Sequence, residues 1–177
     1  LNISKLMEEK VKEAMTQGDS LGGTIACQVI NPPPALGSPV FDKLEARLAQ
    51  ALLSLPACRG FEIGEGFNAS KLYGSEHNDL LFYCEKKDSI RTKTNNAGGI
   101  VGGISNGEKI CFRTVFKPTA SIKLSQTTVN EKKESVSLSA KKGRHDPCVL
   151  PRATSLVEAM TILVLLDEIL RQRSVTL

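Results

Sequence analysis

"GGIVGGISNGEKICFRTVFKP", residues 98–118, carries the strongest β-strand signal in the chain. Asn106 and Gly107 form the pair preferred in tight hairpin turns, and β-prone runs lie on both sides of them. Alternate residues of the second run fall on one face: Ile110, Phe112, Thr114 and Phe116. The stretch therefore predicts a hairpin whose second strand buries that face, ends at Pro118 and leaves Lys117 at its tip.

Helical and strand patterns alternate on both sides of this hairpin. Apolar residues at helical spacing predict helices at 4–17, 38–55 and 156–170. Runs rich in β-branched and aromatic residues predict strands at 24–30, 58–67, 79–86 and 136–140. The polar stretches between them predict a loop at 88–96 and a turn at 125–135.

The second of these helices has a clear start signal and one apolar stripe. Ser38 and Pro39 are typical N-cap and first-turn residues. The stripe consists of Phe41, Leu44, Leu48, Leu52 and Leu55, and the residues facing away are Lys43, Arg47 and Gln50. Such a helix packs its stripe against a core.

The last helix differs, because it is apolar on nearly all sides. Ser155 and Glu158 have the spacing of a capping box, and we expect the helix to be deeply buried. With 177 residues, 41% of them hydrophobic, the chain can form one domain with an aliphatic core. Helices packed on one face of a mostly antiparallel sheet give an α+β fold class.

Composition disfavours several function classes. The net charge is +4, but the basic residues are scattered along the chain with acidic residues between them. This pattern argues against a nucleic-acid partner. The longest apolar run, 159–166, is too short to span a membrane. The five cysteines form no CxxC pair, so we expect no metal site and no disulfide framework, and a reducing compartment. Cys148 is most simply a buried structural thiol.

Two segments could bind a ligand through glycine or turn chemistry. The glycine pairs 98–99 and 102–103 weaken a strand, so either close packing or a flat ligand must explain them, and close packing is the simpler reading. The run 117–121 places an ammonium, two hydroxyls and free backbone donors just beyond a strand end. It is either a clamp for a phosphate or a ring edge, or an exposed turn.

The loop "KKGRHDPCVLPRATS", residues 141–155, gathers charge next to the apolar last helix. Pro147 holds Asp146 in an extended conformation, and Arg144 can bind an anion in two-pronged fashion. Arg152 lies near the helix N-terminus, where the backbone also favours an anion. A structural Arg144–Asp146 ion pair is the alternative, but the concentration of polar groups favours an anion site.

In this loop and in several other stretches, the sequence resembles chorismate synthase. The resemblance rests on "GRHDPCVLPRA", "VEAM", "ALGSPVFDKLEARLAQAL", "GFEIGEGF", "GSEHND", "NNAGGIVGGISNG" and "FKPTASI", which occur in the family's order. It implies a layered β-α-β sandwich in which antiparallel sheets pack on helices. It also implies a lyase that removes phosphate from 5-enolpyruvylshikimate 3-phosphate, a small-molecule substrate, to give chorismate in the shikimate pathway.

The resemblance further implies reduced FMN (FMNH2) as cofactor. Carried over residue by residue, the flavin contacts fall on Pro56, Ala57, Gly102, Lys117, Pro118, Thr119, Ala120, Ser121 and Arg144. Asp146 matches the acidic residue placed near flavin N5 on the proton path, which makes it the candidate catalytic residue. We expect Lys117, Gly102 and Arg144 to converge on one flavin edge, and Arg152 either to bind an anion or to brace the loop.

The same resemblance implies a homotetramer and a cytoplasmic enzyme, or a plastid one if a transit peptide precedes it. We expect residues 1–177 to be the carboxy-terminal part of a single domain, because the family's Gly-Glu-Ser-His-Gly motif and most substrate-binding arginines do not occur. His77 and His145 should not replace the family's catalytic histidines, and His145 is expected to orient neighbours by a hydrogen bond. The rival interpretation is an inactive fragment or a non-enzymatic module that binds FMN or phosphate.

Overall fold

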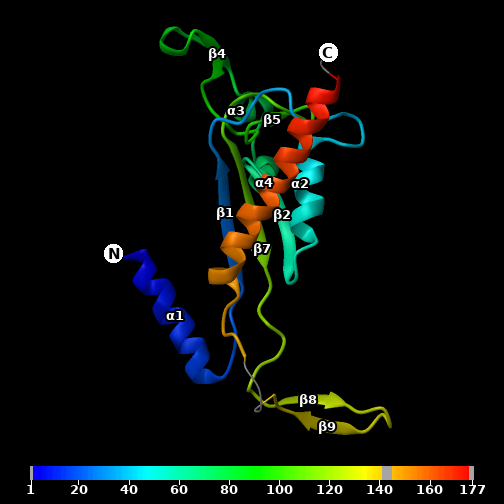
Figure 1. The fold of residues 1–177 in the computed structure, drawn as a ribbon. Helices are drawn as coiled ribbons and strands as arrows, with labels where there is room; N and C mark the ends of the chain where they lie inside the picture. Colours follow the sequence, from blue (N-terminus) through cyan, green and yellow to red (C-terminus); the bar gives the residue numbers. More distant parts are fainter. Residues whose placement is uncertain (1, 141–144, 176–177) are drawn as a thin grey trace.

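The computed structural model describes residues 2–140 and 145–175, with the elements shown in Figure 1. The helices are α1 (Ile3–Gln17), α2 (Leu44–Leu53), α3 (Gly74–His77) and α4 (Leu150–Val175), with 3₁₀ turns at Gly66–Lys71 and Glu85–Lys87. The strands are β1 (Gly23–Val29), β2 (Cys58–Ile63), β3 (Leu81–Cys84), β4 (Ser89–Thr92), β5 (Ile100–Val101), β6 (Ile104–Ser105), β7 (Ile110–Phe116), β8 (Gln126–Val129) and β9 (Ser135–Leu138).

The core is a three-stranded antiparallel sheet in the order β1-β7-β2, with α2 and α4 on one face (Figure 1). The central strand, β7, buries the face predicted from its alternation: Ile110, Phe112, Thr114 and Phe116 are each at most 3% exposed. Leu44, Leu48 and Leu52 of α2 are fully buried in the same core. The α+β class and the course of β7 up to Lys117 are confirmed.

The predicted hairpin turn at Asn106–Gly107 is wrong. The tight turn lies instead at Gly102–Gly103, which have φ of +63° and +93° and connect the paired strands β5 and β6. Two successive positive φ values are what a two-residue hairpin turn needs, and glycine adopts them without strain. Strand β7 pairs with β1 and β2, so Asn106 and Gly107 belong to the connection between β6 and β7.

Helices α2 and α4 begin elsewhere than expected. Helix α2 starts at Leu44, because the Ser38 amide donates to the Asp42 carbonyl (2.8 Å) and closes a turn there, which leaves Phe41 93% exposed. Arg47 does not face away from the core: it pairs with Asp167 (2.6 Å) of α4. Helix α4 starts at Leu150, with Pro151 in its first turn, where the missing amide is not needed.

Helix α4 is buried on one face only, so deep burial is wrong for the described part of the chain. Its buried residues are Ala153, Val157, Thr161, Val164 and Glu168. Leu156, Leu163, Leu166 and Leu170 lie on the other side and are half-exposed or more. The described residues therefore form one main sheet with a helix layer on it.

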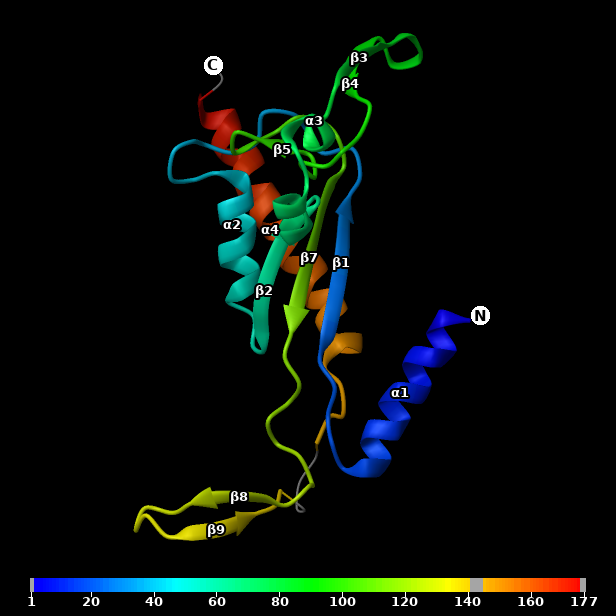
Figure 2. The same cartoon turned by 180° about the vertical axis from the view of Figure 1, so that it is seen from behind.

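Two segments predicted as loop or turn contain strands. Strand β4 pairs with β3, and β8 pairs with β9, in two-stranded hairpins that project from opposite ends of the core sheet (Figures 1 and 2). All residues of β8 and β9 are exposed. The sequence of β8, QTTV, lacks the alternation of apolar and polar residues that reveals a strand. Among the described helices, none is long and apolar enough to cross a membrane.

Candidate functional site

The candidate site lies where β7 ends and β2 begins. Lys117 follows the last β7 residue, and its amide donates to the Ala57 carbonyl (2.9 Å). Ala57 has φ of +67°, and this conformation turns the chain from Pro56 into β2, whose first residue Cys58 pairs with Phe116. Ala57 and Lys117, remote in sequence, are therefore held side by side.

The run from Lys117 to Ser121 is fixed by contacts on both sides. The Ser20 hydroxyl donates to the Thr119 carbonyl (2.7 Å), and the Thr119 hydroxyl donates to the Asp146 carbonyl (2.9 Å). Gly22 leaves room for the start of the run, because a Cβ there would overlap the Phe116 carbonyl oxygen. The segment 117–121 and Asp146 thus form one surface.

The loop that carries Asp146 is attached to the segment before β1. The Leu21 amide donates to the Pro147 carbonyl (2.7 Å), and Leu21 and Cys148 form a parallel bridge. Cys148 is a free, partly buried thiol, in keeping with a structural role. Arg144, one of the expected flavin contacts, lies outside the described residues.

Arg152 braces the Asp146 side chain. Its guanidinium Nη2 lies 2.5 Å from Asp146 Oδ1, an ion pair that reaches from the first turns of α4 back to the loop. The Asp146 side chain keeps 32% of its surface exposed. The carboxylate is therefore oriented by one partner and still open on one side, as a group that exchanges protons with a ligand must be.

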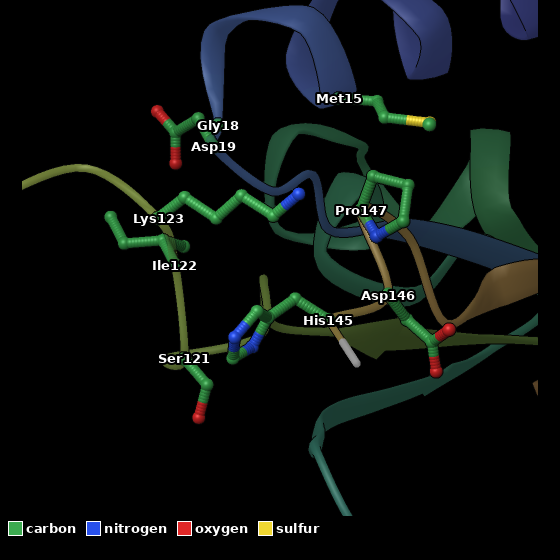
Figure 3. Close-up of a pocket in the computed structure, with 9 residues that line it drawn as sticks. All are labelled: Met15, Gly18, Asp19, Ser121, Ile122, Lys123, His145, Asp146 and Pro147. Carbon is green, nitrogen blue, oxygen red and sulfur yellow. The ribbon is translucent and has the colours of Figure 1, made fainter. Parts of the chain in front are cut away.

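A small cavity of about 60 Å³ adjoins this surface (Figure 3). Its lining consists of Met15, Gly18, Asp19, Ser121, Ile122, Lys123, His145, Asp146 and Pro147. No sequence pattern singles out Lys123 or Asp19, which the fold brings together from the segment before β8 and the end of α1. The orienting hydrogen bond expected of His145 is not seen at Nε2, which is buried and has no hydrogen-bond partner among the described residues.

Gly102 is not part of this cluster. It lies in the β5–β6 turn, next to the start of β7, whereas Lys117 follows the end of β7 (Figure 1). A seven-residue strand is about 20 Å long. Gly102 and Lys117 therefore do not converge within one chain.

The glycines near this turn have different physical roles. A Cβ on Gly98 would overlap the Gly64 amide nitrogen, and one on Gly99 would overlap the Lys109 carbonyl oxygen. These two are required by close packing. A Cβ on Gly102 would meet no atom within 4 Å, and the turn borders an open groove of about 700 Å³ lined in part by His77, Leu80 and Val101.

Asp79 holds the segment that leads to this turn, a role that sequence reasoning missed. Its carboxylate accepts hydrogen bonds from the Thr94 hydroxyl (2.7 Å), the Asn96 amide (2.7 Å) and the Ala97 amide (2.9 Å). Burial alone would raise the pKa of Asp79, but these three hydrogen bonds outweigh it and lower the pKa, and His77 lowers it further. The last residue of the motif "GSEHND" thus holds the backbone just before Gly98 in place.

We expect Asp79→Asn to destabilise the fold at neutral pH, with a difference that shrinks in acid. Because the folded pKa lies below the ordinary value of 3.8, the carboxylate stabilises the fold above that value and loses its effect as pH falls through the folded pKa. Urea unfolding of both proteins from pH 7 to pH 3 measures this. Glu131→Gln, on an exposed turn, is the matched control. A stability difference between wild type and the Asp79→Asn variant that does not vary with pH would contradict the assignment.

Comparisons with known proteins place the chain in one family. A sequence family described as "Chorismate synthase" matches residues 1–170. Chorismate synthases of Prochlorococcus marinus (strain MIT 9211) and Synechococcus sp. (strain RCC307) are 60% and 56% identical over 171 residues each, 97% of this chain and 47% of theirs. A solved structure described as "Crystal Structure of Chorismate Synthase" superposes with a TM-score of 0.75 at 30% identity, covering 95% of this chain and 43% of that one. The chain spans about half the length of the curated relatives it matches.

Proposed function

The chain belongs to the chorismate synthase family, and we propose that it forms part of an enzyme that eliminates phosphate from 5-enolpyruvylshikimate 3-phosphate to give chorismate. One observation carries this proposal: the family's flavin positions Ala57 and Lys117–Ser121 and the acidic position Asp146 come from separate parts of the sequence and meet at one end of β7.

The residues present fit a reduced flavin. Positions 117–121 offer one ammonium, two hydroxyls and backbone groups on an irregular segment, and such surfaces bind flat rings mainly through main-chain contacts. Pro56 and Ala57 would form the neighbouring edge. When bound, FMNH2 would supply electron density to the allylic C–O bond as phosphate departs.

Asp146 would hold or accept the proton that leaves the substrate. Arg152 orients its carboxylate, and the Thr119 hydroxyl fixes the backbone on which it stands. Lys117, at the end of β7, would place a positive charge where negative charge develops. Because Arg152 already orients the Asp146 carboxylate, little reorganisation of that group would oppose the reaction.

We further propose that Gly102 reaches a flavin held by a second copy of the chain. The separation of about 20 Å along β7 prevents Gly102 from joining its own Lys117. The open space over Gly102 and the groove beside it leave room for a neighbour. A homotetramer would supply such contacts, and the free cysteines suit a cytoplasmic protein.

An anaerobic assay of the full-length protein tests the proposed function. We expect chorismate to form from 5-enolpyruvylshikimate 3-phosphate only when reduced FMN is present. The 177-residue chain assayed alone should give no turnover. Flavin binding by the full-length protein without chorismate formation would favour the alternative, a module that binds FMN or phosphate.

A further inference from the structure

The β5–β6 turn that carries Gly102 is attached to the rest of the protein through Ser105, a residue to which the proposed reaction gives no role. Ser105 is the last residue of β6 and comes three positions after Gly102. It is polar, yet only 3% of its surface is exposed. We propose that Ser105 is a positioning residue that holds the turn in the orientation needed to contact a flavin. The inference rests on the proposed function and deepens it, because Ser105 acts through Gly102.

The Ser105 hydroxyl connects two points of the loop that follows β1. It donates a hydrogen bond to the Pro33 carbonyl (2.7 Å) and accepts one from the Leu36 amide (2.9 Å). Residues 32–34 are three successive prolines, which have no amide hydrogen and cannot pair with a strand in the ordinary way. A hydroxyl can donate and accept at once. The Ser105 side chain thus supplies a partner that the proline segment cannot obtain from backbone pairing alone.

The backbone of Ser105 pairs with the same loop. The Ala35 amide donates to the Ser105 carbonyl (2.8 Å), and the Ser105 amide donates to the Leu36 carbonyl (2.9 Å). Together with the hydroxyl, residue 105 therefore makes four hydrogen bonds to residues 33–36. Leu36 is fully buried in the core, so this loop is a fixed support for β6.

The supported loop and α2 together hold the turn. The amide of Leu44, the first residue of α2, donates to the Gly103 carbonyl (2.9 Å). Gly37 of the loop packs against the same carbonyl, because a Cβ on Gly37 would lie 2.3 Å from that oxygen. A Cβ on Gly102 would meet no atom within 4 Å, so the contacts of its neighbours set its position. A change in the loop at residues 33–37 is therefore passed on to Gly102.

The loop has a second attachment that does not involve Ser105. Gln172 Nε2 of α4 donates to the Ala35 carbonyl (3.1 Å), and Arg171 forms an ion pair with Asp42 (3.4 Å). These contacts remain when the Ser105 hydroxyl is removed. We therefore expect a variant without the hydroxyl to fold, with the orientation of the turn less well fixed.

The test measures FMN binding by the full-length protein with Ser105→Ala. This change leaves the Pro33 carbonyl and the Leu36 amide without their side-chain partner. We expect FMN to bind about fivefold more weakly, which corresponds to about one net hydrogen bond. Thr161→Val is the matched control, since Thr161 is also 3% exposed and its hydroxyl donates to the Val157 carbonyl (2.7 Å) within α4. The control should lose stability and bind FMN as the wild type does.

Two further variants distinguish positioning from general stability. Ser105→Cys keeps a weaker donor and acceptor in the same place, so its FMN affinity should lie between those of Ser105→Ala and the wild type. Adding Ser105→Ala to Gly102→Asn should weaken FMN binding no further, because the contact through which Ser105 acts is already lost.

The possible outcomes separate this inference from the proposed function. FMN affinity of Ser105→Ala equal to that of the wild type, or equal losses in Ser105→Ala and Thr161→Val, would overturn the positioning role. An effect of Ser105→Ala that is as large in the Gly102→Asn background as alone would also overturn it. If Gly102→Asn itself leaves FMN binding unchanged, the proposed contact between the turn and a flavin is wrong, and the role of Ser105 is refuted with it.

Discussion

Replacing Asp146 by asparagine in the full-length enzyme is expected to lower kcat by about 10² to 10⁴-fold, the usual contribution of a positioned acid or base, while FMN still binds. Asparagine has nearly the same shape as aspartate and can still accept a hydrogen bond from Arg152, which in the native protein lies 2.5 Å from Oδ1. The Thr119 hydroxyl bonds the backbone carbonyl of residue 146 and is unaffected. The substitution therefore removes the ability to take a proton and little else.

A companion variant separates chemistry from loop bracing. Arg152→Gln keeps the carboxylate of Asp146 but loses the ion pair that orients it, so a smaller loss of kcat is expected than for Asp146→Asn. Single-turnover rates and FMN titrations of both variants provide the comparison. Near-normal turnover by Asp146→Asn would remove this residue from the mechanism, whatever Arg152→Gln does.

The second large effect concerns Gly102. Gly102→Asn should preserve the β5–β6 turn, because Asn-Gly is a favoured pair for two successive positive φ values, and the new Cβ meets no atom of its own chain within 4 Å. The added side chain would nevertheless stand between the turn and a ring held by another copy. We expect an unchanged melting temperature and FMN binding weakened about tenfold or more through lost van der Waals contact.

Co-expression distinguishes a site shared between copies from one within a single copy. Asp146→Asn chains are nearly inactive, and Gly102→Asn chains should keep about one tenth of wild-type activity at FMN concentrations well below the wild-type Kd. If two-fold related copies exchange Gly102, an equal mixture of the two chains should recover about one quarter of the sites. Lys117→Ala with Asp146→Asn is the matched control: both residues lie at the same end of β7, so no intact site can form. Absence of recovery in the first mixture would place Gly102 outside the flavin site.

Several elements could be predicted because their residues face the core. The alternation along β7 and the stripe Leu44–Leu48–Leu52 in α2 follow directly from burial on one side. Predictions failed where that link is absent: the one apolar residue of β4, Ile90, is 69% exposed, and all residues of β8 are exposed. In α4, Leu163 looks like a core residue in sequence yet is 60% exposed in the described structure.

The site was foreseen in part. Of the residues expected at the end of β7, Ala57, 117–121 and Asp146 lie together there, because a strand end fixes where its next residues lie. The expected convergence of Gly102 with Lys117 ignored the length of the strand between them, which the sequence already indicated. The role of Asp79 was not predicted, because its partners Thr94, Asn96 and Ala97 lie 15 to 18 residues further along the sequence. No local sequence pattern indicates a hydrogen bond over that separation.

The most direct measurement is a crystal structure of the full-length protein with FMN bound. We predict the flavin ring against residues 117–121 and Ala57, with the Asp146 carboxylate near N5 and Gly102 of another copy at its edge. Density for the flavin in any other place, with the end of β7 bare, would contradict it.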